Sequence, residues 1–257
     1  MKNYSDLTGR VAVVIGGTSG LGRAIAIGMA EAGADVVATG RRAQNVEEVA
    51  AEIEKTGRKS LRQTMDIADR STIDTLRDAT LAELGHVDIL VNAAGRTFRK
   101  PTVDVTEADW NGLMDTNLTG MLRACQSFYK PLVASKRGRV INIASLSSFV
   151  SLFEVAAYAA SKSAVLSLTK SLAIEWARQG VNVNAIAPGV FRTDLNSALL
   201  DGTDRGREFL LRTPMGRFGK AEELVGAAVL LASDAASYIT GQCIAVDGGF
   251  LASGVNQ

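Results

Sequence analysis

Short apolar runs alternate with longer amphipathic segments along the whole chain. Strand-like runs rich in Val, Ile and Ala occupy residues 11–16, 34–40, 87–95, 138–145 and 181–189. Because these runs are continuous rather than alternating, they predict strands that are buried on both faces of a sheet. The amphipathic segments between them predict helices over residues 20–33, 43–57, 69–85, 106–135, 154–179 and 220–233. This β-α order is typical of an α/β protein with a doubly wound parallel sheet and helices on both faces.

The pattern shows no internal boundary. No repeat, low-complexity tract or proline-rich linker interrupts it, so we expect one domain over residues 1–257. Residues 193–214 differ from the rest because they are rich in Asp, Gly and Arg and lie between a strand end and the next clear helix. We predict that this stretch is a substrate lid.

Composition and charge narrow the choice of partners. Hydrophobic residues make up 47% of the chain and charged residues 21%, which is ordinary for a folded globular protein. Lys and Arg total 28 against 27 for Asp and Glu, so a formal net charge of +1 leaves no surplus to neutralise a nucleic-acid backbone. No apolar run reaches the ~18 residues of a membrane span, and the polar beginning MKNYSDLTGR is unlike a secretory signal. We therefore expect a cytoplasmic protein that binds a small molecule, with no nucleic-acid or membrane partner.

The two cysteines, Cys125 and Cys243, lie far apart and lack CxxC spacing or nearby histidines. This pattern indicates neither a zinc site nor a required disulfide. We expect two buried thiols and no bound metal.

The first predicted strand leads into a glycine-rich loop, IGGTSGLGRAIA, and directly on into the first predicted helix. Gly16, Gly20 and Gly22 give the spacing G-x-x-x-G-x-G. Glycines at this junction allow a tight turn and a close approach of the backbone to a pyrophosphate, whose charge a helix N-terminus favours. A flexible strand–helix turn has the same composition, but the position after the first strand favours a dinucleotide site.

The second strand ends in ATGRR, where a dinucleotide-binding fold places the group that contacts the adenosine ribose. A carboxylate there would accept from a free 2′-hydroxyl, whereas Arg41 and Arg42 suit a 2′-phosphate. The sequence therefore predicts NADP as cofactor, with NAD as the alternative if the two arginines are only a solvated helix start.

Tyr158 and Lys162 lie four residues apart in AAYAASKSAV. On a helix these positions share a face, and a neighbouring ammonium lowers the pKa of a phenol toward that of a general acid or base. Ser145 ends the predicted strand at 138–145 and offers a hydroxyl to the same substrate oxygen, and Asn117 offers a site for a proton-relay water. A nucleophilic serine would need a nearby base, and the only histidine, His86, falls in a predicted helix–strand turn.

Together these motifs resemble the single-domain members of the short-chain dehydrogenase/reductase family over essentially the whole chain. NAAG at 92–95 is similar to the family's N-N-A-G, PG at 188–189 followed by Thr193 is similar to its nicotinamide-binding turn, and four residues match its catalytic tetrad: Asn117, Ser145, Tyr158 and Lys162. Ile15 and Ala93 depart from the family pattern, where threonine and asparagine are usual. The resemblance implies a Rossmann-like sheet of seven strands.

The resemblance also implies a mechanism. A hydride passes between the nicotinamide and a carbonyl or carbinol carbon while Tyr158 exchanges the proton at oxygen, Ser145 holds that oxygen, and Lys162 lowers the phenol pKa and binds the nicotinamide ribose. The cofactor positions implied by the match are Gly16, Thr18, Ser19, Gly20, Leu21, Gly22, Arg41, Arg42, Asp66, Ile67, Asn92, Gly95, Tyr158, Lys162, Pro188, Gly189, Val190 and Thr193. Homotetramers built through the helices near 106–135 and 154–179 are common in the family.

Within the family, residues 212–249 are similar to gluconate 5-dehydrogenases and to related sugar-acid and polyol dehydrogenases. Arg99 is a candidate for binding a substrate carboxylate, together with Ser145 and Tyr158, unless it belongs to an exposed charged loop. The same segment also resembles 3-oxoacyl-[acyl-carrier-protein] reductases, which is the alternative activity. A non-catalytic dinucleotide sensor or scaffold is an alternative of another class, although such a protein has no need of Tyr158.

Overall fold

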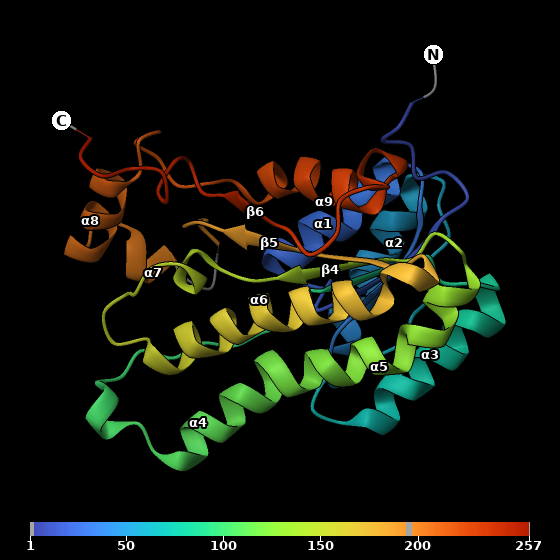
Figure 1. Cartoon of the computed structure of the whole chain (residues 1–257), viewed down its shortest axis with the longest axis horizontal. Coiled ribbons are helices and arrows are strands. Elements are labelled where there is room, and N and C mark those ends of the chain that lie inside the picture. Colours follow the sequence, from blue (N-terminus) through green and yellow to red (C-terminus); the bar gives the residue numbers. More distant parts are fainter. Residues whose placement is uncertain (1–2, 194–196, 257) are drawn as a thin grey trace.

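The five apolar runs predicted as strands all form strands in the computed structural model, which describes residues 3–193 and 197–256. A sixth strand follows near the end of the chain. In chain order the strands are β1 (Val11–Ile15), β2 (Asp35–Thr39), β3 (Ile89–Asn92), β4 (Arg139–Ile143), β5 (Asn182–Pro188) and β6 (Cys243–Val246). All pairs are parallel, in the order β2-β1-β3-β4-β5-β6. Figure 1 labels the last three strands of this order, β4, β5 and β6.

Helices cover both faces of this sheet. They are α1 (Gly20–Glu31), α2 (Ala43–Lys55), α3 (Arg70–Leu84), α4 (Glu107–Met114), α5 (Gly120–Ala134), α6 (Ala156–Trp176), α7 (Ser197–Leu200), α8 (Asp204–Arg212) and α9 (Val225–Ala232). Shorter turns are η1 (Thr102–Asp104), η2 (Asp115–Thr119), η3 (Leu146–Ser148), η4 (Ala177–Gln179), η5 (Ala221–Leu224) and η6 (Asp234–Ala236). Within the described ranges, no helix combines the length and apolar character needed to cross a bilayer.

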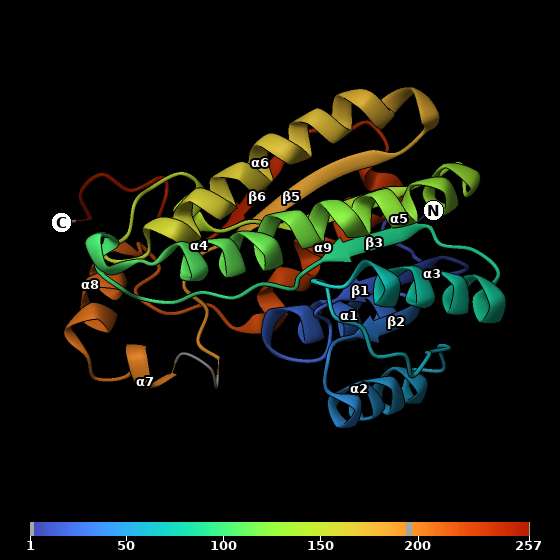
Figure 2. The same ribbon diagram turned by 90° about the horizontal axis from the view of Figure 1, so that it is seen from below.

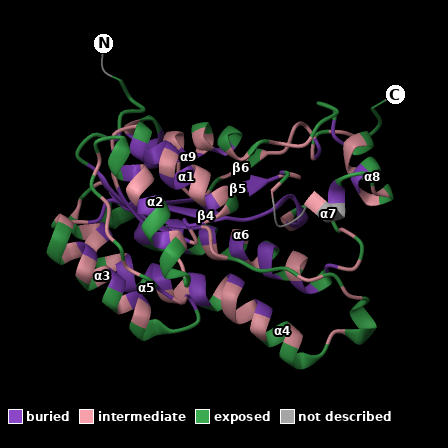
Figure 3. Ribbon diagram, turned by 180° about the vertical axis from the view of Figure 1, so that it is seen from behind, coloured by how far each residue is buried: buried purple, intermediate pink, exposed green. Residues whose placement is uncertain are grey.

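The core consists of two layers, one on each side of the sheet. Along β1, Val13 and Ile15 pack with α3, α5 and α6, whereas Ala12 and Val14 pack with α1, α2 and α9. This alternation is the period-two pattern of a strand with two buried faces. Figure 2 shows α3, α5 and α6 on one side of the strands, and Figure 3 shows that the buried residues concentrate along the sheet.

The expectation of seven strands is wrong by one, because six form among the described residues. The missing strand corresponds to residues 58–66. This segment connects α2 to α3 and runs beside β2. Backbone hydrogen bonds join this segment to the β2 region at Lys59 and Met65. Between these points the hydroxyls of Ser60 and Thr39 donate to backbone carbonyls across the gap. In a regular β-ladder, backbone N–H groups would donate to these carbonyls. Here side-chain hydroxyls donate to them instead.

Two predicted helices differ from the observed ones. The span 106–135 forms α4 and α5, joined by the π-helical turn η2. The span 154–179 becomes helical only at Ala156, because Glu154 has a left-handed backbone with φ of 63°. Both irregularities lie beside predicted catalytic residues, and π turns are frequent at functional sites.

Helix α8 is held by the last described segment of the chain. Phe209 of α8 packs against Phe250 with ring centroids 6.4 Å apart, and the Asn256 side chain donates to Leu211 O at 2.6 Å. Arg212 lies over the Phe250 ring at 5.1 Å. Figure 1 shows α8 and this segment together beyond the carboxyl ends of β5 and β6.

The two cysteines are free thiols that differ in burial. Cys125 on α5 is fully buried, and its burial raises its pKa to about 12. Cys243 is only half-buried because β6 is an edge strand, so the expectation of two buried thiols is wrong for Cys243. Partial burial still raises the pKa of Cys243 to about 11.

Candidate active site

Ser145 and Tyr158 meet at the carboxyl edge of the sheet. Ser145 follows β4 and begins the turn η3, where its Oγ accepts from Ser147 N–H at 3.2 Å and from Ser147 Oγ at 3.0 Å. Tyr158 lies in the first turn of α6 and hydrogen-bonds with Ser145. Two hydroxyls from separate elements therefore converge, as the sequence predicts.

Lys162 lies one helical turn after Tyr158, and its Nζ is 5.8 Å from the centre of the Tyr158 ring. Its ammonium donates to Ile143 O, the last carbonyl of β4, at 2.7 Å. The side chain is buried, and this burial lowers its pKa to about 8. Lys162 thus ties α6 to the end of β4.

The pKa of Tyr158 differs from the expectation drawn from the motif. Burial raises this pKa, and the hydrogen bond with Ser145 opposes that rise. The Lys162 ammonium donates instead to the Ile143 carbonyl, at 2.7 Å. In the chain by itself, Ser145 is the group that favours the phenolate.

Asn117 lies in the π-helical turn η2 and is fully buried. Its Oδ1 accepts from Arg96 N–H at 2.8 Å, while its Nδ2 donates to Arg96 O at 2.9 Å and to Ser161 Oγ at 3.1 Å. A Cβ added at Gly95 would lie 3.4 Å from Asn117 Oδ1 and 3.5 Å from Lys162 Nζ. Asn117 and Lys162 therefore border the same space, although the Asn117 amide is already engaged with the chain.

The glycine loop requires glycine for two different reasons. Gly16 has φ of 78°, and a Cβ there would lie 2.5 Å from the Ala94 backbone nitrogen. Gly22 lies in the first turn of α1 and packs against Gly16, so that a Cβ on Gly22 would lie 2.2 Å from Gly16 O. The first reason is a left-handed backbone and the second is contact between two backbone segments.

The first turn of α1 is open to an anion. Ser19 is its N-cap but makes no side-chain cap hydrogen bond, and no acidic residue lies in the first turn. Thr18 is buried against Gly40 at the end of β2, since a Cβ on Gly40 would lie 2.6 Å from Thr18 Oγ1. Uncapped N–H groups at a helix start suit a pyrophosphate.

A cavity of about 690 Å³ opens beside this turn. Its lining includes Ser19, Gly20, Arg42 and Thr193 from the predicted cofactor set. Arg41 and Arg42 are exposed, and neither forms an ion pair with another described residue. The Arg42 guanidinium in a cavity beside an open helix start, with Arg41 preceding it in the chain, fits a cofactor that carries both a pyrophosphate and a 2′-phosphate.

Asn92 and Gly95 follow β3 but differ in position. The Asn92 side chain is buried and donates to Asn142 Oδ1 at 2.9 Å, so it holds β3 to β4. Gly95 is exposed beside Lys162 and Asn117. The Asn92 Oδ1 has no hydrogen-bond partner among the described residues, so a cofactor contact through this oxygen would leave the bond to Asn142 intact.

The other predicted cofactor positions lie in turns or in the first turn of α1. Asp66 precedes α3, and its Oδ1 accepts from Ala68 N–H at 3.0 Å, while Ile67 is buried. A Cβ added at Gly189 would lie 2.6 Å from Asp247 Cα, so glycine is needed for packing there. The remaining positions are Leu21 in α1, Pro188 at the end of β5, and Val190, whose carbonyl accepts from Gly219 N–H at 3.0 Å.

Comparison with known proteins agrees with this geometry. A family model described as enoyl-(acyl carrier protein) reductase matches residues 15–251. The chain belongs to the short-chain dehydrogenase/reductase family. Similar solved structures share the open parallel sheet flanked by helices.

Relatives of this short-chain dehydrogenase act on sugar acids and polyols. It is 42% identical to 2-dehydro-3-deoxy-D-gluconate 5-dehydrogenase of Dickeya dadantii, over 97% of this chain and 98% of that protein. It is 38% identical to D-threitol dehydrogenase of Mycolicibacterium smegmatis, over 95% of this chain and 94% of that protein. A gluconate 5-dehydrogenase from Burkholderia cenocepacia, solved in complex with NADP and tartrate, matches with a TM-score of 0.93 at 37% identity, covering 98% of each chain.

Arg99 of this short-chain dehydrogenase is exposed, yet it is not a free cation. Its Nε forms an ion pair with Glu154 Oε2 at 2.6 Å, and its guanidinium lies 5.8 Å from the centre of the Phe153 ring. Both partners lie just before α6, which carries Tyr158. Arg99 therefore lies beside the segment that leads into α6, where it is paired with a carboxylate of the chain.

Ser161 is a residue whose role the sequence reasoning missed. It sits between Tyr158 and Lys162 and reads as a small spacer, but it is buried, donates to Tyr158 O at 2.7 Å and accepts from Asn117. The sequence signal that distinguishes Ser161 from its alanine neighbours is its hydroxyl group, at the position next to Lys162. Ser161 joins η2 to α6 and thereby positions two members of the tetrad.

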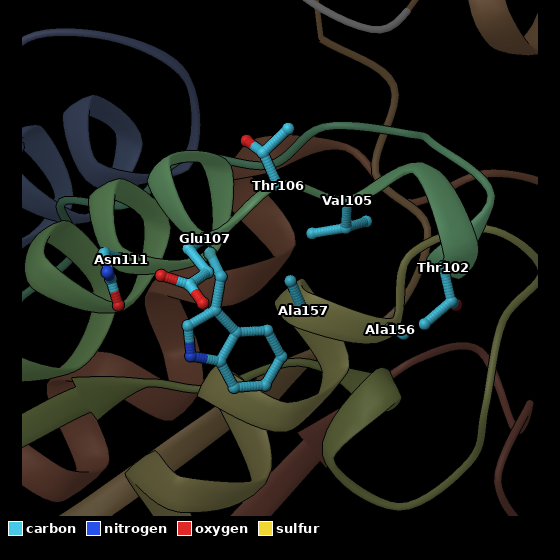
Figure 4. Close-up of a pocket in the computed structure, with 8 residues that line it drawn as sticks. Thr102, Val105, Thr106, Glu107, Asn111, Ala156 and Ala157 are labelled. Carbon is cyan, nitrogen blue, oxygen red and sulfur yellow. The ribbon is translucent and has the colours of Figure 1, made fainter.

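A second cavity, of about 370 Å³, lies outside the catalytic cleft between α4 and the start of α6. Figure 4 shows Val105 and Thr102 on one side of it and Ala156 and Ala157 on the other. None of its lining residues belongs to the predicted catalytic or cofactor set. This cavity is therefore separate from the predicted catalytic residues.

Proposed function

We propose that this chain is an NADP-dependent oxidoreductase that transfers a hydride between the nicotinamide and a secondary alcohol or ketone of a sugar acid. The observation that carries the proposal is the convergence of Ser145, Tyr158 and Lys162 at the carboxyl edge of the sheet. In open α/β sheets, ligands bind at this edge, where the strand order reverses. Here β1 lies between β2 and β3, directly before the glycine loop.

The chain's own groups supply the proton chemistry. When bound, the nicotinamide supplies the hydride or accepts it. The Tyr158 hydroxyl gives its proton to the substrate oxygen during reduction and takes it back during oxidation, and the Ser145 hydroxyl donates a hydrogen bond to that same oxygen. Lys162 holds Tyr158 and the end of β4 in a fixed relation through its bond to Ile143 O.

The preference for NADP rests on Arg41 and Arg42. Both follow β2, are exposed and lack an ion-pair partner among the described residues, so a 2′-phosphate would give them charge-assisted hydrogen bonds. The related gluconate 5-dehydrogenase of Burkholderia cenocepacia, whose structure contains NADP, supports the same choice.

The sugar-acid assignment rests on the relatives and on Arg99 beside the segment that leads into α6. The Dickeya relative acts on a sugar acid, and the Burkholderia neighbour binds tartrate, a hydroxy dicarboxylate. Polyol oxidation is the second candidate, because the D-threitol dehydrogenase is nearly as similar. The two differ in one functional group, the terminal carboxylate.

Following nicotinamide absorbance tests the proposal. The chain is incubated with NADP or NAD and a panel of sugar acids, polyols and 3-oxoacyl thioesters, alongside the Tyr158→Phe variant. We expect turnover of sugar acids with NADP and none in the variant. Binding of NADP without turnover of any compound would favour a scaffold, and turnover of thioesters alone would favour acyl-carrier-protein reductase activity.

Three further features belong to this proposal. We place the enzyme in the cytoplasm, as a homotetramer assembled through α4, α5 and α6, whose exposed residues include Trp110 and Ile174. Residues 193–214 act as the lid, of which 194–196 lie outside the described residues. Light scattering in solution tests the tetramer.

A further inference from the structure

Two arginines from distant parts of the sequence lie beside the segment of Phe153 and Glu154, just before α6. Arg99 pairs with the Glu154 carboxylate at 2.6 Å and lies over the Phe153 ring. Arg205, from α8, donates from Nη1 to Phe153 O at 3.4 Å. Both guanidinium groups therefore border this segment.

Arg205 differs from Arg99 in its ion pairing. Among the described residues it forms no ion pair, and its guanidinium lies over the Phe209 ring at 5.3 Å. Half-burial lowers its pKa, the charge of Arg99 lowers it further, and Glu208 and Glu154 oppose both effects. An arginine in this state is stabilised by an incoming anion.

The position of this arginine pair links it to the reaction. Glu154 lies four residues before Tyr158, at the end of the loop that begins at Ser145. Helix α8 lies beyond the carboxyl ends of β5 and β6 (Figure 1). A substrate whose reacting carbon lies at Tyr158 would extend its other end toward the loop that Arg99 and Arg205 contact.

We propose that Arg205 and Arg99 form the subsite for the substrate carboxylate, with Arg205 as the specificity-determining residue. Without substrate, the Glu154 carboxylate pairs with the Arg99 guanidinium. When substrate binds, its carboxylate binds Arg205 directly and competes with Glu154 for Arg99. The planar guanidinium fork matches a carboxylate in two parallel hydrogen bonds. The subsite rests on the proposed sugar-acid function and deepens it.

The test compares one acid with its neutral counterpart. D-Gluconate and D-glucitol differ at the carboxylate, so kcat/KM is measured for both in the wild type and in Arg205→Gln and Arg205→Lys. Loss of a hydrogen bond to a charged group predicts a fall of about ten- to a hundredfold for gluconate in Arg205→Gln. Glucitol turnover stays unchanged, and Arg205→Lys, which keeps the charge but loses the planar fork, falls between the wild type and Arg205→Gln for gluconate.

Two further variants sharpen the result. Arg207→Gln is the matched control, because Arg207 is on the same helix but is exposed and paired with Asp204. Its acid-to-neutral ratio stays that of the wild type. Glu154→Gln removes the competing carboxylate, so the KM for gluconate falls while that for glucitol stays constant.

Specific results would overturn the subsite. If Arg205→Gln lowers gluconate and glucitol turnover equally, Arg205 only clamps α8 to the loop. If gluconate turnover is unchanged, the carboxylate binds elsewhere. Should the wild type turn over neither compound, the proposed function fails, and calorimetric binding of gluconate then decides the subsite: weaker binding in Arg205→Gln but not in Arg207→Gln supports it, and equal binding in all three proteins refutes it.

Discussion

Replacing Lys162 with methionine should change how the stability of the protein depends on pH. The Lys162 ammonium is buried at the end of β4, and this burial lowers its pKa from 10.5 to about 8. Methionine has a similar length but carries no charge. The variant therefore removes both the buried charge and the hydrogen bond to Ile143 O.

The magnitude follows from the pKa difference. A fall from 10.5 to about 8 corresponds to about 3 kcal/mol that disfavours the folded protein when Lys162 is charged. The folded pKa lies below the unfolded one, so the unfolded chain binds more protons between these values and wild-type stability rises with pH there. Between about pH 7 and pH 10, the wild type should gain about 2 to 3 kcal/mol relative to Lys162→Met.

Guanidinium-induced unfolding of both proteins over this pH range measures the difference. Comparing the two proteins at each pH cancels all other titrating groups, and the lost hydrogen bond contributes a constant offset. Lys170→Met is the matched control, because Lys170 lies on the same helix but is exposed, and its difference from the wild type should stay flat. A flat difference for Lys162→Met as well would show that burial does not lower the pKa of Lys162, and would refute the reasoning.

The remaining predictions concern catalysis, cofactor choice and the glycine loop. Tyr158→Phe should keep NADP affinity and lower turnover by about a hundred- to ten-thousandfold, because only the transferable proton is lost; unchanged turnover would contradict the assigned role. Arg41→Asp should move the NADP/NAD ratio of kcat/KM toward NAD by at least about tenfold, since a carboxylate repels the 2′-phosphate. Gly16→Ala should lower the unfolding temperature and NADP affinity, because its Cβ would lie 2.5 Å from the Ala94 nitrogen. Gly226→Ala, on a helix with open space around it, should instead stabilise by about 0.5 to 1 kcal/mol, and equal effects of the two glycine substitutions would argue against the close-contact explanation.

The sequence predicts the features that depend on local pattern. The runs at 11–16 and 181–189 form strands because continuous Val, Ile and Ala residues bury both faces of a sheet. Tyr158 and Lys162 share a helix face because their spacing fits one turn. The glycine loop falls at the first strand–helix junction for the same local reason.

Features that depend on distant contacts are missing from the sequence-based picture. The absent seventh strand depends on hydroxyls such as Ser60 that contact β2 across the sheet edge. The raised pKa of Tyr158 depends on the burial of its side chain, which no spacing along the helix reveals. The pairing of Arg99 with Glu154 joins residues 55 positions apart, and Arg205 reaches them from a third segment. None of these follows from periodicity or composition.

The packing of α8 against Phe250 and Asn256 separates two properties of this enzyme. Ser145 lies just after β4, and Tyr158 and Lys162 lie on α6. Arg205 lies instead on α8, which Phe250 and Asn256 contact. With Arg205 in its proposed role, substitutions at Phe250 or Asn256 would move α8 and change the range of accepted substrates. The groups that transfer the proton would stay in place. Directed evolution aimed at a new substrate range can therefore randomise the positions near residue 250 and leave the proton-transfer residues unchanged.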